Sequence, residues 1–145
     1  MGLADAQSVE ENLSSEHYLI VPVSCPVPSR AAGAPKLSGK CRIRLRPGTR
    51  VHAILGREEI HEEHFCNYEV NPAFQAQFDA AGLKITGEDD SGIARAVELP
   101  GHRFFLATLF QPQLSSEAGR PHPLVVAFLE AARAFQQGRV AAQSA

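Results

Sequence analysis

The chain has few of the features that mark several protein classes. Three cysteines in 145 residues are too few for a disulfide framework and fit a reducing cytosol. A formal net charge of -2 lacks the basic excess with which nucleic-acid binders neutralise phosphates. No apolar run approaches the roughly 20 residues of a membrane span. We therefore expect a cytoplasmic protein that binds neither nucleic acid nor membrane.

The remaining composition is that of an ordinary globular protein. Apolar residues make up 44% and charged residues 21% of the chain. The N-terminal MGLADAQSVEEN has neither the basic nor the apolar stretch of a signal peptide, and we find no internal repeat. The sequence predicts one domain over residues 1–138 and a disordered tail over residues 139–145, where small and polar residues follow Gly138.

Alternating residues in the first half predict strands. YLIVPV at residues 18–23 is a short apolar strand, and residues 26–39 form a loop rich in Pro, Ala, Ser and Gly. Residues 41–45 alternate strictly, so their apolar side chains face one way and the arginines at 42, 44 and 46 face the other. We interpret that basic strip as the solvated face of an edge strand, with anion binding as the alternative.

The rest of the chain mixes helices and strands. We expect a helical turn at residues 51–55, an extended segment at 58–70 and a hairpin of strands 83–86 and 93–99 across GEDDSG. Asn71 and Pro72 are typical of a helix start, and Gly82 is typical of a helix end. The last helix should run from Pro123 to about residue 137, with one apolar stripe of Leu124, Phe128, Ala132 and Phe135.

The stretch from Glu98 to Leu124 organises the second half. Its apolar run, Phe104 to Phe110, predicts a strand buried on both faces. The run ends at Gln111-Pro112, and a polar loop leads to Pro123 at the start of the last helix. A strand end followed by a loop and a helix is where α/β proteins place their chemistry.

These residues resemble a known family. ELPGHRFFLATLFQPQ and RPHPL are similar to the C-terminal end of the class I glutamine amidotransferase domain of CTP synthase, roughly E-L-P-x-H-x-[FW]-[FY]-x-A-x-x-F-H-P-E and R-P-x-P-H-P-L. GLADAQSVEE resembles the family segment after the nucleophile-bearing helix. The resemblance implies an α/β fold: the C-terminal part of a flavodoxin-like amidotransferase domain, a mixed sheet with flanking helices.

The resemblance also implies degenerate catalytic residues. Gln111 stands where the family has its catalytic histidine, and Gln113 where it has the orienting carboxylate. Asn67, before Tyr68, replaces an arginine that contacts the glutamine substrate, and the G-x-C-x-G elbow is absent from these residues. A carboxamide cannot act as a general base near neutral pH, and loss of the base costs on the order of 10⁴- to 10⁶-fold in such triads. We expect a binding or regulatory module without glutaminase activity.

The cysteines give an alternative function. VPVSC, FCNYEVNP and FQP resemble the CTP synthase C-terminal region-related (seleno)protein group, which implies cysteine or selenocysteine at the position of Cys25. Cys25 would then be a redox or nucleophilic thiol with Cys66 as a possible partner, and the alternative is an inert core cysteine. Cys41 lies on the apolar face of its strand, which favours a packing role.

We predict no metal and no cofactor. His61, His64 and Cys66 have the spacing H-x-x-H-x-C, but on a strand His61 points to the opposite face from the other two. His102 and His122 are interpreted as structural.

The expected truncation leads to a prediction about partners. Half of such a domain exposes sheet surface that is normally covered, so we expect a homodimer or a partner that supplies the missing half. A third hypothesis is a CTP synthase-type amidotransferase fragment that works only with its N-terminal half.

Overall fold

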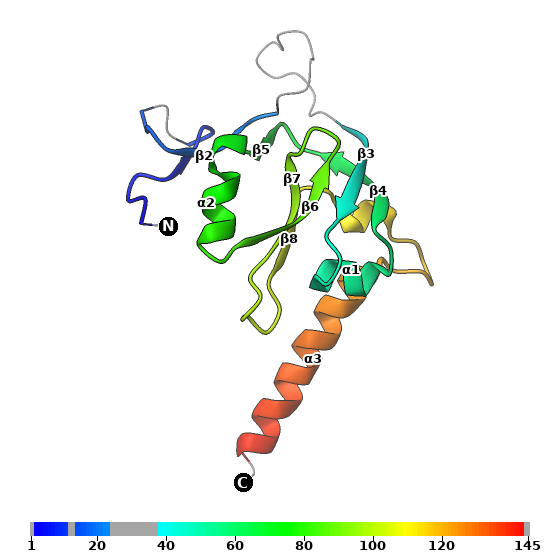
Figure 1. Cartoon of the computed structure of the whole chain (residues 1–145). Coiled ribbons are helices and arrows are strands. Elements are labelled where there is room, and N and C mark those ends of the chain that lie inside the picture. The colour runs from blue at the N-terminus through cyan, green and yellow to red at the C-terminus, as the bar shows by residue number, and fades with distance from the viewer. Residues whose placement is uncertain (1, 12–13, 24–37, 144–145) are drawn as a thin grey trace.

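The computed structural model describes residues 2–11, 14–23 and 38–143, and its mixed α/β architecture is the class expected from the sequence (Figure 1). A five-stranded antiparallel sheet has the order β4-β3-β6-β7-β8, and a small second sheet has the order β1-β2-β5. The larger sheet contains β3 (Ser38–Leu45), β4 (Glu59–Phe65), β6 (Lys84–Asp89), β7 (Ala94–Glu98) and β8 (Leu106–Thr108). The smaller sheet contains β1 (Gln7–Ser8), β2 (Tyr18–Pro22) and β5 (Tyr68–Val70).

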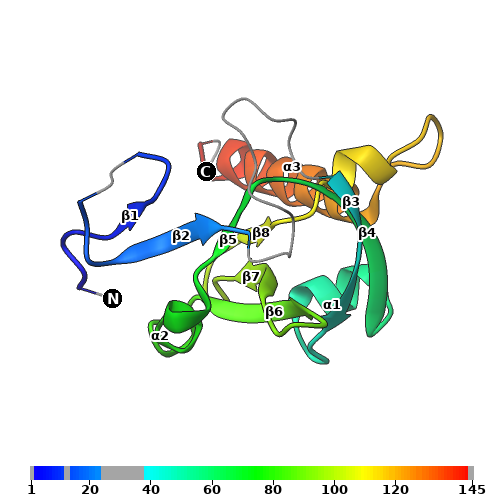
Figure 2. The same cartoon turned by 90° about the horizontal axis from the view of Figure 1, so that it is seen from above.

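Helices lie at the margins of these sheets. They are α1 (Arg50–Leu55), α2 (Gln75–Ala80), α3 (Pro123–Gln143) and the 3₁₀ turns η1 (Pro72–Phe74) and η2 (Pro112–Ser115). Seen from above, the small sheet lies to one side of the five-stranded sheet, and α3 runs along the other side (Figure 2). In the described residues, no helix is long and apolar enough to cross a membrane.

The core lies on the inner face of the larger sheet, under α1 and the start of α3. The alternation of β3 places Ile43 and Leu45 in it and leaves Arg42 and Arg44 exposed, as predicted. The rest of the buried cluster comes from α1, from the other strands, from the loop before η2 and from the start of α3. Its members are Val51, Ile60, Ala96, Phe110 and Leu124.

Two close packing details hold the hairpin and α1 in place. Gly87 of β6 has no side chain because a Cβ there would lie 3.0–3.1 Å from atoms of Leu45, Ala96 and Ile43. Glu98 of β7 is buried, and its carboxylate accepts hydrogen bonds from the backbone N–H groups of Arg50 (3.0 Å) and Val51 (2.7 Å). A strand residue therefore caps the start of α1.

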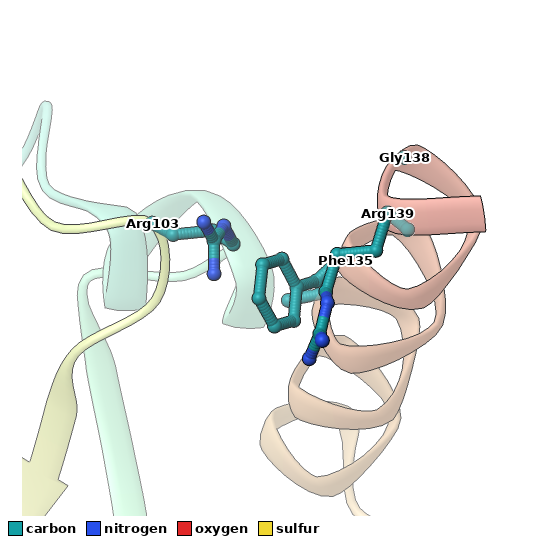
Figure 3. A pocket seen from close by; sticks show the side chains of 6 residues that line it. Arg103, Phe135, Gly138 and Arg139 are labelled. Carbon is teal, nitrogen blue, oxygen red and sulfur yellow. The ribbon is translucent and has the colours of Figure 1, made fainter. Parts of the chain in front are cut away.

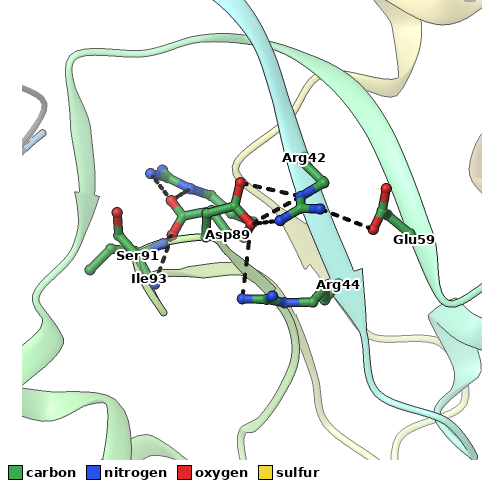
Figure 4. A network of polar contacts seen from close by, with 8 residues as sticks. Arg42, Arg44, Glu59, Asp89, Ser91 and Ile93 are labelled. Carbon is green, nitrogen blue, oxygen red and sulfur yellow. Dashed lines mark hydrogen bonds and ion pairs between the residues drawn. The ribbon is translucent and has the colours of Figure 1, made fainter.

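The interpretation of the basic strip as an edge strand is wrong. β3 lies between β4 and β6, so it is an internal strand. Its exposed arginines are balanced by acidic side chains around them: Arg42 pairs with Asp90 at 2.6 Å and with Glu59 at 3.5 Å (Figure 4). The alternation identified the exposed face but could not identify the neighbours of the strand.

Several predicted elements have different limits. The polar segment 2–11, which the sequence indicates to be a loop or a helix end, contains β1, and β1 pairs with β2 in parallel. The extended segment 58–70 divides into β4 and β5, which belong to different sheets.

The last strand and the last helix also differ from prediction. β8 covers only three residues at the edge of its sheet, and Phe105 beside it is 40% exposed, so the strand is not buried on both faces in this chain. α3 continues past Gly138 to Gln143, so its predicted end near residue 137 is wrong. In its expected apolar stripe Leu124 is buried, but Phe128 and Phe135 are exposed because most of α3 extends away from the body (Figure 1).

Candidate functional site

The loop that follows β8 packs against β4. The backbone N–H of Gln111 donates to the carbonyl of Glu63 at 2.9 Å. The side-chain Oε1 of Gln111 is buried, and it has no hydrogen-bond partner in the part of the chain that the structure describes. Gln113, in η2, is exposed. The strand end therefore presents two carboxamides, one turned inward and one facing solvent.

A buried carboxylate anchors this loop to the sheet. Glu62 of β4 accepts a hydrogen bond from Ser115 Oγ through Oε2 (2.7 Å), and its Oε1 lies 3.1 Å from His122 Nε2. His122 Nδ1 accepts from the backbone N–H of Leu124 at 3.2 Å. Because Nδ1 accepts, Nε2 carries the ring proton and donates it to Glu62.

The geometry of this group is that of a structural anchor. Ser115, His122 and Glu62 are residue types that also occur in nucleophile–base sites. Here both ring nitrogens of His122 are engaged, and the hydroxyl of Ser115 donates to the carboxylate rather than to the imidazole. The group joins β4, η2 and the start of α3, which agrees with the structural role expected for His122.

A second buried polar group joins the two sheets. Arg95 of β7 donates from Nη2 to Glu69 Oε2 of β5 at 3.0 Å and from Nε to Asp89 Oδ2 at 2.8 Å. Glu69 is 1% exposed, and the side chains of Arg95 and Asp89 are each 13% exposed. Asp89 also accepts from the backbone N–H groups of Ser91 and Ile93 at the hairpin turn (Figure 4). The guanidinium thus binds two structural carboxylates through Nε and Nη2.

The described cysteines, Cys41 and Cys66, are free thiols. Cys41 is half-buried on β3, and burial raises the pKa of its thiol. Cys66 follows β4 and is also half-buried. Cys25 lies outside the described residues, so its position relative to Cys66 and Gln111 stays a prediction.

The predicted substrate-contact positions lie at the junction of the two sheets. The carbonyl of Asn67 accepts from the backbone N–H of Val23 at 2.9 Å, and Tyr68 pairs with Pro22 in the small sheet. Both residues follow the end of β4, the strand that Gln111 contacts, and Tyr68 begins β5.

The histidines of the H-x-x-H-x-C segment do not form a metal cluster with their neighbours. His61 is exposed and stands opposite Arg42, whereas His64 is half-buried opposite Gly39. Within residues 2–11, 14–23 and 38–143, no group of three or more His, Cys, Asp or Glu side chains could hold a metal ion.

Sequence reasoning missed the two buried carboxylates Glu62 and Glu69. A signal for Glu62 was present, because it lies two residues after Ile60 on the inward face of the same strand. No comparable signal marks Glu69, whose partner Arg95 is 26 residues further along the chain.

A surface hollow of about 640 Å³ lies where the loop before β8 approaches α3. There the Arg103 guanidinium carbon lies 3.7 Å from the ring centroid of Phe135, and that of Arg139 lies 5.7 Å away (Figure 3). These cation–π contacts fix the side chains against one another.

Comparisons with known proteins agree with this fold. No protein-family model matches the chain. CTP synthase of Caldivirga maquilingensis is 37% identical over 139 residues, which cover 95% of this chain and 26% of that protein. CTP synthase of Rubrobacter xylanophilus is 36% identical over 147 residues, with 99% and 26% covered. The chain thus spans about a quarter of the length of these curated relatives.

A solved structure identifies the matching part. The glutaminase domain of Trypanosoma brucei CTPS, determined with bound acivicin, superposes with a TM-score of 0.81 at 32% identity. The match covers 91% of this chain and 52% of that one. The chain is homologous to the glutaminase domain of CTP synthase and has its fold.

Proposed function

We propose that the chain is a glutaminase-domain-like binding module without glutaminase activity of its own. The observation that carries this proposal is Gln111 at the end of β8. By its motif this residue takes the place of the catalytic histidine, and its side-chain oxygen is buried without a described partner. A carboxamide has no group that titrates near neutral pH, so this strand end cannot accept a proton from a thiol.

Of the described residues, neither His122 nor Gln113 supplies a substitute base. His122 is the first histidine after Gln111 along the chain, but both of its ring nitrogens are engaged by Glu62 and the Leu124 backbone. Gln113, in the place of the orienting carboxylate, is neutral and exposed. Asn67 brings no charge to the position where the family holds the substrate carboxylate. Gln111 removes a group that could transfer a proton, and Gln113 and Asn67 each remove a charge. The chain keeps the fold with all three residues in place.

The test is glutamine hydrolysis by the purified chain. We expect ammonia release at buffer background, with the Trypanosoma brucei glutaminase domain as the active control. Gln111→His should not raise the rate, because a base alone lacks the elbow nucleophile. Ammonia release that persists in Gln111→Ala and disappears in Cys25→Ser would show a different catalytic thiol and refute the proposal.

A further inference from the structure

Two arginines share one aromatic ring in the hollow between α3 and the loop before β8. The guanidinium carbon of Arg103 lies 3.7 Å from the ring centroid of Phe135, and that of Arg139 lies 5.7 Å from it (Figure 3). Arg103 belongs to the loop and Arg139 to α3, so two segments far apart in the sequence bring positive charge to one place. The ring holds both side chains, so a ligand that binds them has less side-chain freedom to remove.

The two guanidinium groups have donors to spare. Within the residues that the structure describes, the guanidinium groups of Arg103 and Arg139 make no ion pair and donate no hydrogen bond. By contrast, Arg42 and Arg95 on the strands each pair with two carboxylates. A guanidinium carries five N–H donors and no acceptor. The donors of Arg103 and Arg139 are therefore open to an anion from outside the chain.

The described walls of the hollow carry no negative charge. Besides the two arginines and Phe135, they consist of Ala131, Ala134 and Gly138. These three residues of α3 are small, so they leave a space of about 640 Å³ beside the guanidinium groups. The hollow is therefore large enough for a small molecule, and it is lined by charge of one sign.

The neighbouring elements add no competing carboxylate. Glu130 is the acidic residue of α3, and at about 100° per residue it projects from the side of the helix opposite Arg139. Residues 99–105 include no Asp or Glu. Arg50 of α1 donates to the backbone carbonyl of Arg103 at 3.0 Å, which fixes the loop and adds positive charge beside it. The potential here is positive although the whole chain has a net charge of -2.

We propose that this hollow binds a small molecule with at least two anionic groups, phosphate or carboxylate, held between Arg103 and Arg139. A guanidinium offers two parallel N–H donors to such an oxyanion, and two guanidinium groups hold two of them. Arg103 already covers one face of the Phe135 ring, so the site recognises the charge of the ligand rather than an aromatic ring. A bound dianion joins the loop to the part of α3 that extends away from the body (Figure 1).

The proposed ligand site is independent of the proposed function. The absence of glutaminase activity was argued from Gln111, Gln113 and Asn67, and none of these residues lines the hollow. Anion binding and glutamine hydrolysis are separate measurements, so either proposal stands or fails without the other.

The experiment titrates the purified chain with inorganic pyrophosphate by isothermal titration calorimetry. A phosphate-free buffer of about 0.1 M ionic strength screens exposed charges that lie more than about 10 Å apart. We expect one saturable site per chain. Arg103→Gln and Arg139→Gln each remove one guanidinium and should weaken binding by at least about tenfold. Acetate, with a single carboxylate, should bind at least about tenfold more weakly than pyrophosphate for the same reason.

A parallel titration with citrate identifies the preferred anionic group. Tighter binding of pyrophosphate would indicate a phosphate ligand, and tighter binding of citrate would indicate a carboxylate ligand. Saturable binding of either anion supports the site. Saturable binding of neither anion, or acetate binding as tight as that of both, would overturn it.

Arg133→Gln is the matched control. Arg133 is an exposed arginine of α3 that does not line the hollow, so its loss should change the affinity by less than about twofold. Amide chemical shifts of the wild-type chain give a readout that does not depend on the folding of a variant. The shifts that pyrophosphate induces should lie in residues 102–105 and 131–139. Unchanged affinity in both hollow variants, an equal loss in Arg133→Gln, or shifts confined to other residues would each overturn the proposal.

Discussion

Arg95 is the residue at which we expect a single substitution to cost most of the inter-sheet stability. Arg95→Met removes the Arg95 counter-charge from two nearly buried carboxylates, Glu69 and Asp89. Breaking a buried pair in this way costs about 3–5 kcal/mol, whereas an exposed pair contributes about 0–1 kcal/mol. Arg42→Met, which breaks the exposed pair with Asp90, is the matched control. Urea unfolding measures the free energy of unfolding of both variants. Equal losses in Arg95→Met and Arg42→Met would contradict the assignment of Arg95 as a stabilising contact between the sheets.

The cysteines should differ in reactivity. Burial raises the pKa of the Cys41 thiol, so the reactive thiolate is scarcer there at neutral pH. We predict that limiting iodoacetamide labels Cys25 fastest and Cys41 slowest, with peptide mapping as the readout. Labelling of Cys41 should rise as the pH approaches its raised pKa. If Cys25 reacts no faster than Cys41, or reacts only after unfolding, the redox hypothesis should be dropped.

At the residue scale, sequence periodicity predicted which side chains point into the core, but it did not predict which side chains contact one another. It placed Ile43 and Leu45 inside and Arg42 outside, because side chains alternate along any strand. It could not show that Glu62 meets His122, 60 residues away, because that contact depends on how β4 and α3 pack. Gln111 and Gln113 were recognised from their motif rather than from any physical pattern.

At the element scale, two glycines provide a test of local helix stability, one inside α3 and one directly after α1. Gly138 lies inside α3, its φ is not positive, and a Cβ there would meet nothing within 4 Å. Gly138→Ala should therefore stabilise the distal part of α3 by about 1 kcal/mol. Gly56, after α1, has a φ of +66°, so Gly56→Ala should destabilise the protein. Slower amide exchange in residues 134–143 would support the first expectation, and unchanged exchange would contradict it.

The elements that sequence predicted well are those with local signals. Asn71 does cap η1, accepting from the Ala73 N–H at 3.0 Å. The hairpin of β6 and β7 was predicted correctly, but β6 continues through residues 87–89 of the predicted loop GEDDSG. β8 was predicted too long and fully buried because an apolar run by itself does not distinguish a long internal strand from a three-residue strand at the edge of a sheet. The end of α3 was missed because one glycine costs a helix only about 1 kcal/mol.

At the scale of the whole molecule, two polar groups hold separate layers together. The Glu62 anchor joins the larger sheet to η2 and α3, and the Arg95 group joins the larger sheet to the smaller one. Neither leaves an unengaged general base in the described site. These interactions hold the layers of the fold together without a contribution from the side chains of Gln111 and Gln113.

His64 should make the stability of the whole fold depend on pH. Burial, and then the nearby positive charge of Arg95, hold the pKa of His64 below its ordinary 6.5. Between the lowered pKa and 6.5 the unfolded chain binds the proton more readily, so stability falls as the pH drops through this window. His64→Gln should reduce the loss in unfolding free energy measured in urea between about pH 7.5 and pH 5. His61→Gln, at an exposed position of the same strand, is the control and should retain the wild-type loss. An identical pH dependence in His64→Gln and wild type would show that another group governs acid sensitivity.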